Sequence, residues 1–257
     1  MRDFTLKKYH LLIETLLSTG YRLLPVVEFL CFESPKAAAL RHDVDRYIQR
    51  AMEMANMEHE LGLKASYFFR KKDIIRHPQI IAQIASLNHE IGYHYENLAA
   101  HKGNPKEAIK DFSETLEHLR KIAWVDGISM HGSPCSRHHN RAIWEIYNYR
   151  NYGIGYEITN DIHYEHILYL TDTGRRWDYG GFNLRDKVYG KRLNRGIVHT
   201  NHLLKALQSN LLAPLLIFNI HPQRWDNRLL PWFAELVGQT LKNKIKRLIR
   251  FRHEPVK

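Results

Sequence analysis

The sequence predicts an α/β fold built around a parallel sheet, and two observations support this class. Short apolar runs that suit buried strands alternate along the chain with longer segments whose apolar residues recur at helical spacing. Buried strands separated by helices are typical of parallel sheets with helical cover. About seven such strands can be counted in 257 residues, a number that suits a distorted barrel.

The alternation of elements begins near the N-terminus and continues to the end of the chain. The expected elements are helices at 5–19, 28–30, 47–61, 78–87 and 105–122, an extended segment at 21–27, and strands at 36–40, 65–69, 90–94, 127–130, 153–156, 167–170 and 215–220. No linker rich in proline, glycine or serine divides them. We therefore expect one domain over residues 1–257, with a helical lead-in at 1–35 and a basic C-terminal helix at about 230–252.

The chain is strongly basic, with a formal net charge of +11. A nucleic-acid-binding protein is one interpretation, but no recognition motif accompanies the charge. Much of the excess lies in residues 242–252, where Leu241, Ile245, Leu248 and Ile249 keep helical spacing and the cations take the other face. We expect a solvated helix that docks on the domain. Peripheral contact with an anionic membrane or a phosphate-bearing carrier is the alternative.

The N-terminus and the cysteines limit the location and the chemistry. No signal-peptide pattern begins the chain and no apolar run is long enough for a membrane span, so a cytoplasmic location is expected. Cys31 and Cys135 are the only cysteines and form no CxxC motif. Any metal ion would therefore bind histidine and carboxylate side chains.

Ionisable side chains follow several of the predicted strands. Asp43 and Asp45 come after the strand at 36–40 and project to the same face. His94, His131 and His221 stand at the ends of three later strands. Alone, the Asp pair would more often cap a helix, and each His would more often be an ordinary hydrogen-bonded residue. Because the carboxyl ends of parallel strands converge, however, we expect these groups to share one site.

Five segments, in this order, resemble the NodB-homology polysaccharide deacetylases, or carbohydrate esterase family 4. The likeness is greatest to the branch associated with lipopolysaccharide and surface-polysaccharide biosynthesis. The segments are Arg41-His42-Asp43-Val44-Asp45, His89-Glu90-Ile91-Gly92-Tyr93-His94, His131-Gly132-Ser133-Pro134, Thr171-Asp172-Thr173-Gly174-Arg175-Arg176-Trp177 and Ile220-His221-Pro222. The resemblance implies a distorted (β/α)7-type barrel and the metal-dependent removal of an N-acetyl or similar acyl group from a sugar.

The resemblance also implies roles for individual residues. Asp43 would be the catalytic base, Asp45 and His94 metal ligands, and His221 the general acid. A bound divalent ion lowers the pKa of water and polarises the acyl carbonyl. Zn²⁺ is the expected ion because nitrogen and oxygen ligands with open coordination positions suit it, with Co²⁺, Ni²⁺ or Mn²⁺ as substitutes.

The pattern departs from the family at Leu98, where the second histidine of the metal motif would stand. Since leucine cannot bind a metal ion, another residue must supply the third ligand. His131 is the first candidate because its strand end should face the same mouth, and His101 and Glu96 are the others. His131 also stands where many relatives carry an arginine that supports the base, so it is a candidate for substrate binding as well.

The segment that begins at Asp172 supplies further candidates. Asp172, with Trp177, resembles the element that positions the acid histidine, although an ordinary turn is an equal interpretation. Arg176, or Arg175 beside it, could orient Asp43 or bind an anionic sugar substituent. Tyr95 and Trp177, and with them Tyr93, could stack on a sugar ring, although core packing is commoner for aromatic residues.

The expected partner is an acylated sugar, either nucleotide-linked or lipid-linked, rather than a nucleic acid. A barrel that binds carbohydrate without catalysis is the alternative, because Leu98 interrupts the metal motif.

Overall fold

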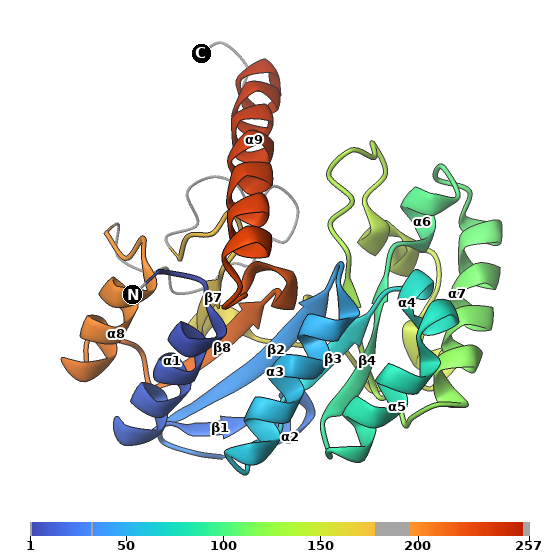
Figure 1. The fold of residues 1–257 in the computed structure, drawn as a ribbon. Helices are drawn as coiled ribbons and strands as arrows, with labels where there is room; N and C mark the ends of the chain where they lie inside the picture. Colours follow the sequence, from blue (N-terminus) through green and yellow to red (C-terminus); the bar gives the residue numbers. More distant parts are fainter. Residues whose placement is uncertain (1, 32, 178–195, 254–257) are drawn as a thin grey trace.

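The computed structural model describes residues 2–31, 33–177 and 196–253 and contains an eight-stranded parallel sheet (Figure 1). The strands are β1 (Arg22–Leu24), β2 (Ala37–Val44), β3 (Ser66–Phe69), β4 (Glu90–Tyr95), β5 (Gly127–Met130), β6 (Tyr156–Glu157), β7 (Leu168–Thr171) and β8 (Leu215–Ile220). The α-helices are α1 (Leu6–Ser18), α2 (Val26–Cys31), α3 (Ile48–Glu60), α4 (Lys71–Arg76), α5 (Pro78–Ser86), α6 (Asn97–Ala100), α7 (Pro105–Arg120), α8 (Thr200–Gln208) and α9 (Leu229–His253). Four 3₁₀ helices complete this part of the chain: η1 (Asn140–Glu145), η2 (Tyr149–Tyr152), η3 (Tyr164–His166) and η4 (Pro222–Arg224).

The strands follow the order β6-β5-β4-β3-β2-β8-β7, and β1 pairs with β2 beside this path. Each strand pair is parallel, and within the described residues β6 and β7 end the path without pairing to each other. The sheet is therefore a curved half-barrel. The predicted α/β class with a distorted barrel is confirmed.

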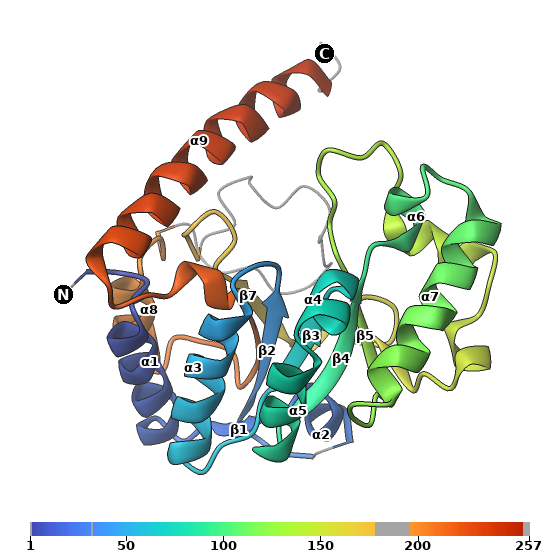
Figure 2. The same ribbon diagram turned by 45° about the vertical axis from the view of Figure 1, so that its right-hand side comes forward.

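Side chains alternate between the two faces of the sheet, as strand geometry requires. On β2, Ala38, Leu40 and Val44 pack in the core that α1, α3, α5, α7 and α8 cover from outside (Figures 1 and 2). Ala37 and Ala39 face inward, into a second cluster to which α2 also contributes. Since the alternation continues along the strand, Arg41 and Asp43 share this inner face at the carboxyl end of β2.

Most of the predicted elements are confirmed. α1, for example, buries Tyr9, Leu12, Ile13 and Leu16 on the stripe that the helical spacing predicts, and Thr5 caps it with its side-chain oxygen. The structure adds α4 and α6, and β6 begins only at Tyr156. Residues 131–166 are mostly loops and 3₁₀ helices, which hydrophobic periodicity does not reveal. Among the described residues, no helix combines the length and hydropathy of a membrane span.

The C-terminal helix α9 differs from expectation in the direction of its apolar face. It was expected to dock on the domain through residues that include Leu241 and Ile245. Each of these two side chains is 56% exposed, so the docking prediction is wrong for them. Both views show α9 projecting from the body of the domain (Figures 1 and 2).

Candidate active site

The carboxylate of Asp43 lies on the inner face of β2 and is almost completely buried. Arg41, two residues earlier on the same face, donates from Nε to Oδ1 at 3.0 Å and from Nη2 to Oδ2 at 2.7 Å. Asn219 on β8 donates to Oδ2 at 3.2 Å. Burial raises the pKa of Asp43, but Arg41, with the His94 and His221 imidazoles, outweighs it and lowers the pKa. Asp43 is therefore a fixed, ionised acceptor at neutral pH.

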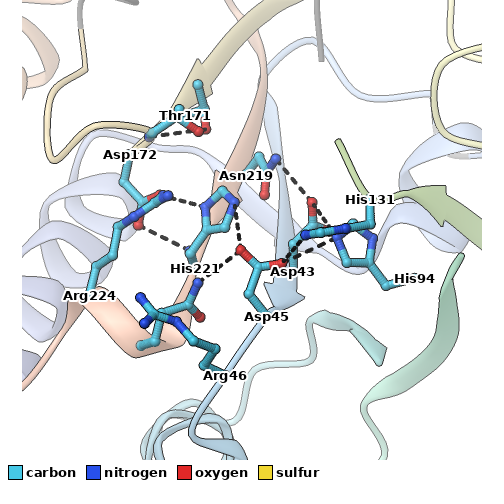
Figure 3. Close-up of polar contacts among 12 residues, drawn as sticks. Asp43, Asp45, Arg46, His94, His131, Thr171, Asp172, Asn219, His221 and Arg224 are labelled. Carbon is cyan, nitrogen blue, oxygen red and sulfur yellow. Dashed lines mark hydrogen bonds and ion pairs between the residues drawn. The ribbon is translucent and has the colours of Figure 1, made fainter. Parts of the chain in front are cut away.

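Asp45 lies just beyond the end of β2, between two imidazoles (Figure 3). Its Oδ1 is 3.5 Å from Nε2 of His94 and 3.6 Å from Nε2 of His131. This oxygen is buried and has no hydrogen-bond partner of normal geometry. The ligand atoms of the three residues all lie within 4.8 Å of one another. A buried, unpartnered carboxylate oxygen facing two imidazole nitrogens suits a divalent cation.

The second ring nitrogen of each imidazole, Nδ1, lies within hydrogen-bonding distance of an acceptor on the side away from Asp45. Nδ1 of His94 is 3.1 Å from both the carbonyl oxygen and the hydroxyl of Ser129. Nδ1 of His131 is 2.9 Å from Oε2 of Glu96. Arg70 also donates to the Glu96 carboxylate, from Nε to Oε1 and from Nη2 to Oε2. A proton on each Nδ1 would leave the Nε2 lone pairs free to coordinate a metal ion. The residues present therefore fit the ion that the resemblance implies.

His221 approaches the same place from the end of β8. Its Nδ1 is 2.6 Å from Oδ1 of Asp172, and its Nε2 lies 4.0 Å from Oδ2 of Asp45. Asp172 is fully buried and also accepts from Arg224, from Nε1 of Trp225 and from the backbone N–H of His221. This network fixes the ring so that Nε2 faces the carboxylates (Figure 3).

These side chains open onto one cavity of about 380 Å³, within the size range of small-molecule sites. Its acid, base and metal-ligand candidates are Asp43, Asp45, His94, His131 and His221. The wall is completed by residues of α9, by the buried Arg224 that binds Asp172, and by a rim that includes the cations Arg46, Arg70 and Lys242. The strand ends thus bring together the five residues that the sequence singled out, from positions 43 to 221.

The structure corrects two of the predicted substrate contacts. Tyr95 is 1% exposed and Trp177 is 0% exposed. Tyr95 follows His94 on β4 and therefore points to the opposite, outer face, where it packs against Phe112. Trp177 packs on Phe218 in the outer core and donates to Thr200. Neither ring presents a face to a sugar in this structure, so both assignments are wrong. Tyr93, on the same outer face, is buried as well.

The arginine assignments also change. Arg175 is buried and donates to the backbone oxygen of Arg224, with its guanidinium over the ring of Phe4. Arg176 is half-buried and is not among the residues that line the cavity. Arg41 is the residue that orients Asp43, and Arg224 contacts Asp172. The role of orienting Asp43 that was predicted for Arg176 therefore belongs to Arg41.

The other candidates for the third metal ligand, His101 and Glu96, are less well placed than His131. Nε2 of His101 is 3.1 Å from Asp111, outside the cavity lining. Glu96 stands behind His131 rather than beside it. Leu98 lies in the outer core on α6 and is 7% exposed. Geometry therefore favours His131 as the third member of the set.

Sequence reasoning missed Arg41, Asn219 and Arg224. The signal for the first two was available, because each lies two residues before a predicted site residue along extended backbone and so shares its face. Arg224 gave no such signal, since η4 brings it to Asp172 through the turn after β8.

Carboxylates, imidazoles and a buried acid–histidine pair thus lie together at the mouth of a parallel half-barrel, and three of these residues form a candidate metal site. No protein-family model and no curated protein matches the sequence. Solved structures with similar folds include a family 4 carbohydrate esterase from Bacillus anthracis, at 12% identity and a TM-score of 0.44, covering 96% of this chain and 88% of that chain.

Two further similar structures have the same TM-score of 0.44. One is a family 4 carbohydrate esterase from Streptomyces lividans in complex with acetate, at 12% identity over 82% of this chain and 89% of that chain. The other is a CE4 family pseudoenzyme from Bacillus anthracis, at 14% identity over 83% of this chain and 66% of that chain. The function proposed below rests on the geometry of the site.

Proposed function

We propose that this protein is a metal-dependent deacetylase that removes an N-acetyl or similar acyl group from a sugar. One observation carries the proposal: a candidate base, a candidate acid and three candidate metal ligands from four separate strand ends face one cavity. Amide hydrolysis needs this combination, because a water must lose a proton and the leaving nitrogen must gain one.

Asp45, His94 and His131 would hold the ion. A divalent ion bound there supplies Lewis-acid activation of water and of the acyl carbonyl. Zinc is the ion we propose first, since two imidazoles and one carboxylate form a common catalytic zinc ligand set. Co²⁺, Ni²⁺ or Mn²⁺ could take its place.

Asp43 would act as the general base. Arg41 and Asn219 keep its carboxylate ionised and pointed at the cavity, so it can accept the proton of the attacking water. His221 would act as the general acid on the opposite side of Asp45. Because Asp172 holds Nδ1, the proton to be delivered to the leaving nitrogen is carried on Nε2, which faces the cavity.

The proposed substrate is a phosphate-bearing precursor of a surface glycan, such as lipopolysaccharide, linked to a nucleotide or a lipid. The cationic side chains of the cavity rim support this choice, because Lys242 is exposed there, and Arg46 and Arg70 stand nearby in ion pairs with Glu235 and Glu96. Arginine and lysine are the usual protein partners of phosphate. An uncharged N-acetylated oligosaccharide would make no use of that rim.

The test is acetate release by the metal-loaded full chain. Three substrate types are compared: a UDP-N-acetylhexosamine, a polyisoprenyl-phosphate-linked N-acetylhexosamine and an uncharged N-acetylated oligosaccharide. Asp43→Asn should abolish release while metal stays bound. The matched control is Asp226→Asn, since Asp226 is equally buried and binds Arg50 and Arg228 away from the cavity lining.

Two results would overturn the proposal. Acetate release by the Asp43→Asn variant at the wild-type rate would show that Asp43 is not the general base. Sugar binding by the metal-loaded wild type without any acetate release would instead favour the non-catalytic carbohydrate-binding barrel.

A further inference from the structure

Helix α9 is attached to the domain through its polar face, which reverses the usual orientation of an amphipathic surface helix. Glu235 and Gln239 are 7% and 5% exposed and line the cavity with Lys242. Arg46 binds Glu235 at 3.1 Å, and Asn243 donates to the backbone oxygen of Gly174 at 3.0 Å. Polar contacts therefore hold this side of the helix.

Several large apolar residues of α9 face solvent instead, although Trp232 is half-buried and donates to the backbone oxygen of Asp3. Leu230 is 81% exposed, Phe233 and Leu241 are each 56% exposed, and Val237 is 43% exposed. They are three or four residues apart, so they form one stripe along the helix. Ile245 is 56% exposed as well, but it lies between this stripe and the cavity face and contributes to the cavity lining. An exposed apolar stripe of this length on a helix that projects from the domain needs a partner (Figures 1 and 2).

The charge along α9 indicates the kind of partner. The sequence from residue 236 to residue 253 contains no aspartate or glutamate, whereas its cations are Lys242, Lys244, Lys246, Arg247, Arg250 and Arg252. Helices with an exposed apolar stripe and flanking cations bind the interface of anionic lipid bilayers. Each lysine or arginine near an anionic bilayer adds to the attraction.

We propose that α9 docks on an anionic lipid surface through the apolar stripe Leu230, Phe233, Val237 and Leu241. The opposite face of the same helix lines the cavity, through Glu235 among others, so the docked helix lies between the lipid surface and the cavity. Docking itself does not depend on the chemistry proposed above.

The test is co-sedimentation of the full chain with phosphatidylcholine vesicles that contain or lack phosphatidylglycerol. The wild type should bind only the anionic vesicles, and added salt should weaken the binding. The double variant Leu230→Ser/Leu241→Ser should lower the partition coefficient by about tenfold or more. Ile146→Ser/Leu211→Ser is the matched control, because Ile146 and Leu211 are 61% and 76% exposed but lie outside α9. The control should bind like the wild type.

Light scattering on the same proteins tests the competing occupant, a second copy of the chain. A wild-type dimer that the Leu230→Ser/Leu241→Ser variant converts to monomer would overturn the proposal, since the stripe would then be a self-interface. Equal binding to neutral vesicles, equal loss in both double variants, or no vesicle binding at all would overturn it too. Because none of these readouts measures turnover, failure here is distinct from failure of the deacetylase proposal.

Discussion

The substitution Asp172→Asn tests the buried network that holds His221. Burial raises the pKa of Asp172, but the Arg224 guanidinium and the His221 imidazole outweigh it and lower the pKa from 3.8 to about 2. Because the side chain is fully buried, solvent screening weakens its interactions with Arg224 and His221 only slightly. The difference in pKa corresponds to about 2 kcal/mol of folding free energy at neutral pH.

The pH dependence follows from the direction of that shift. Because the pKa is lower in the folded state, the carboxylate stabilises the fold fully above about pH 4, and this stabilisation disappears as the pH falls toward 2. We expect Asp172→Asn to lower the free energy of unfolding by at least about 2 kcal/mol at pH 7, and by roughly half as much at pH 3. Urea denaturation followed by tryptophan fluorescence measures both values.

Glu157 supplies a control, because its pKa is shifted in the opposite direction to that of Asp172. It is fully buried, and burial raises its pKa from 4.5 to about 7 although Thr159 and Asn160 donate to it. Its ionisation therefore costs folding free energy as the pH rises from 4.5 to 7, so Glu157→Gln should stabilise the protein at pH 8 by up to about 3 kcal/mol and leave it unchanged at pH 4. An Asp172→Asn deficit of equal size at pH 7 and pH 3 would refute the electrostatic reasoning.

Three further predictions concern the metal site. Asp43→Asn should keep the metal affinity, measured by titration calorimetry, while acetate release falls by about two to four powers of ten, and an unimpaired rate would contradict the role of base. His131→Ala should reduce that affinity by at least about tenfold, whereas an unchanged affinity would assign the third position to another group. Glu96→Gln should weaken metal binding by about 10–100-fold, because its carboxylate holds Nδ1 of His131, and an effect no larger than that of a surface variant would exclude this coupling.

Much of the fold was predictable because buried strands and amphipathic helices leave opposite periodicities in the sequence. The strands at 127–130 and 215–220 were predicted with the boundaries that the structure shows. The region from 131 to 166 was not, since its 3₁₀ helices are short and are held by tertiary contacts. One example is Asn140, whose side chain donates to the backbone oxygen of His131 and accepts from the backbone of Ala99.

Strand position predicted the site better than residue type did. His94 and Tyr95 are neighbours on β4, yet one faces the cavity and the other the outer core. Counting every second residue along β4 would have excluded Tyr95, and the same count along β2 and β8 would have included Arg41 and Asn219. The partner of Asp172 in η4, Arg224, required the folded chain, because no local pattern relates residues 172 and 224.

The orientation of α9 was predicted wrongly because its sequence alone does not determine which face of the helix contacts the domain. An amphipathic helix can present either face to the domain, and apolar packing is the usual outcome. Here the polar face contacts the domain, because Glu235 and Gln239 are buried there. Residues distant in the sequence supply polar partners, and Arg46, which binds Glu235, is one of them.

The central claim is that Asp45, His94 and His131 form a binding site for a divalent ion. Metal analysis by mass spectrometry tests it most directly, on the full chain loaded with Zn²⁺ and freed of excess ion, beside the Asp45→Asn/His94→Ala double variant. We predict a single zinc ion per wild-type chain and none in the double variant. A wild-type chain without zinc, or a double variant that retains it in full, would contradict the claim.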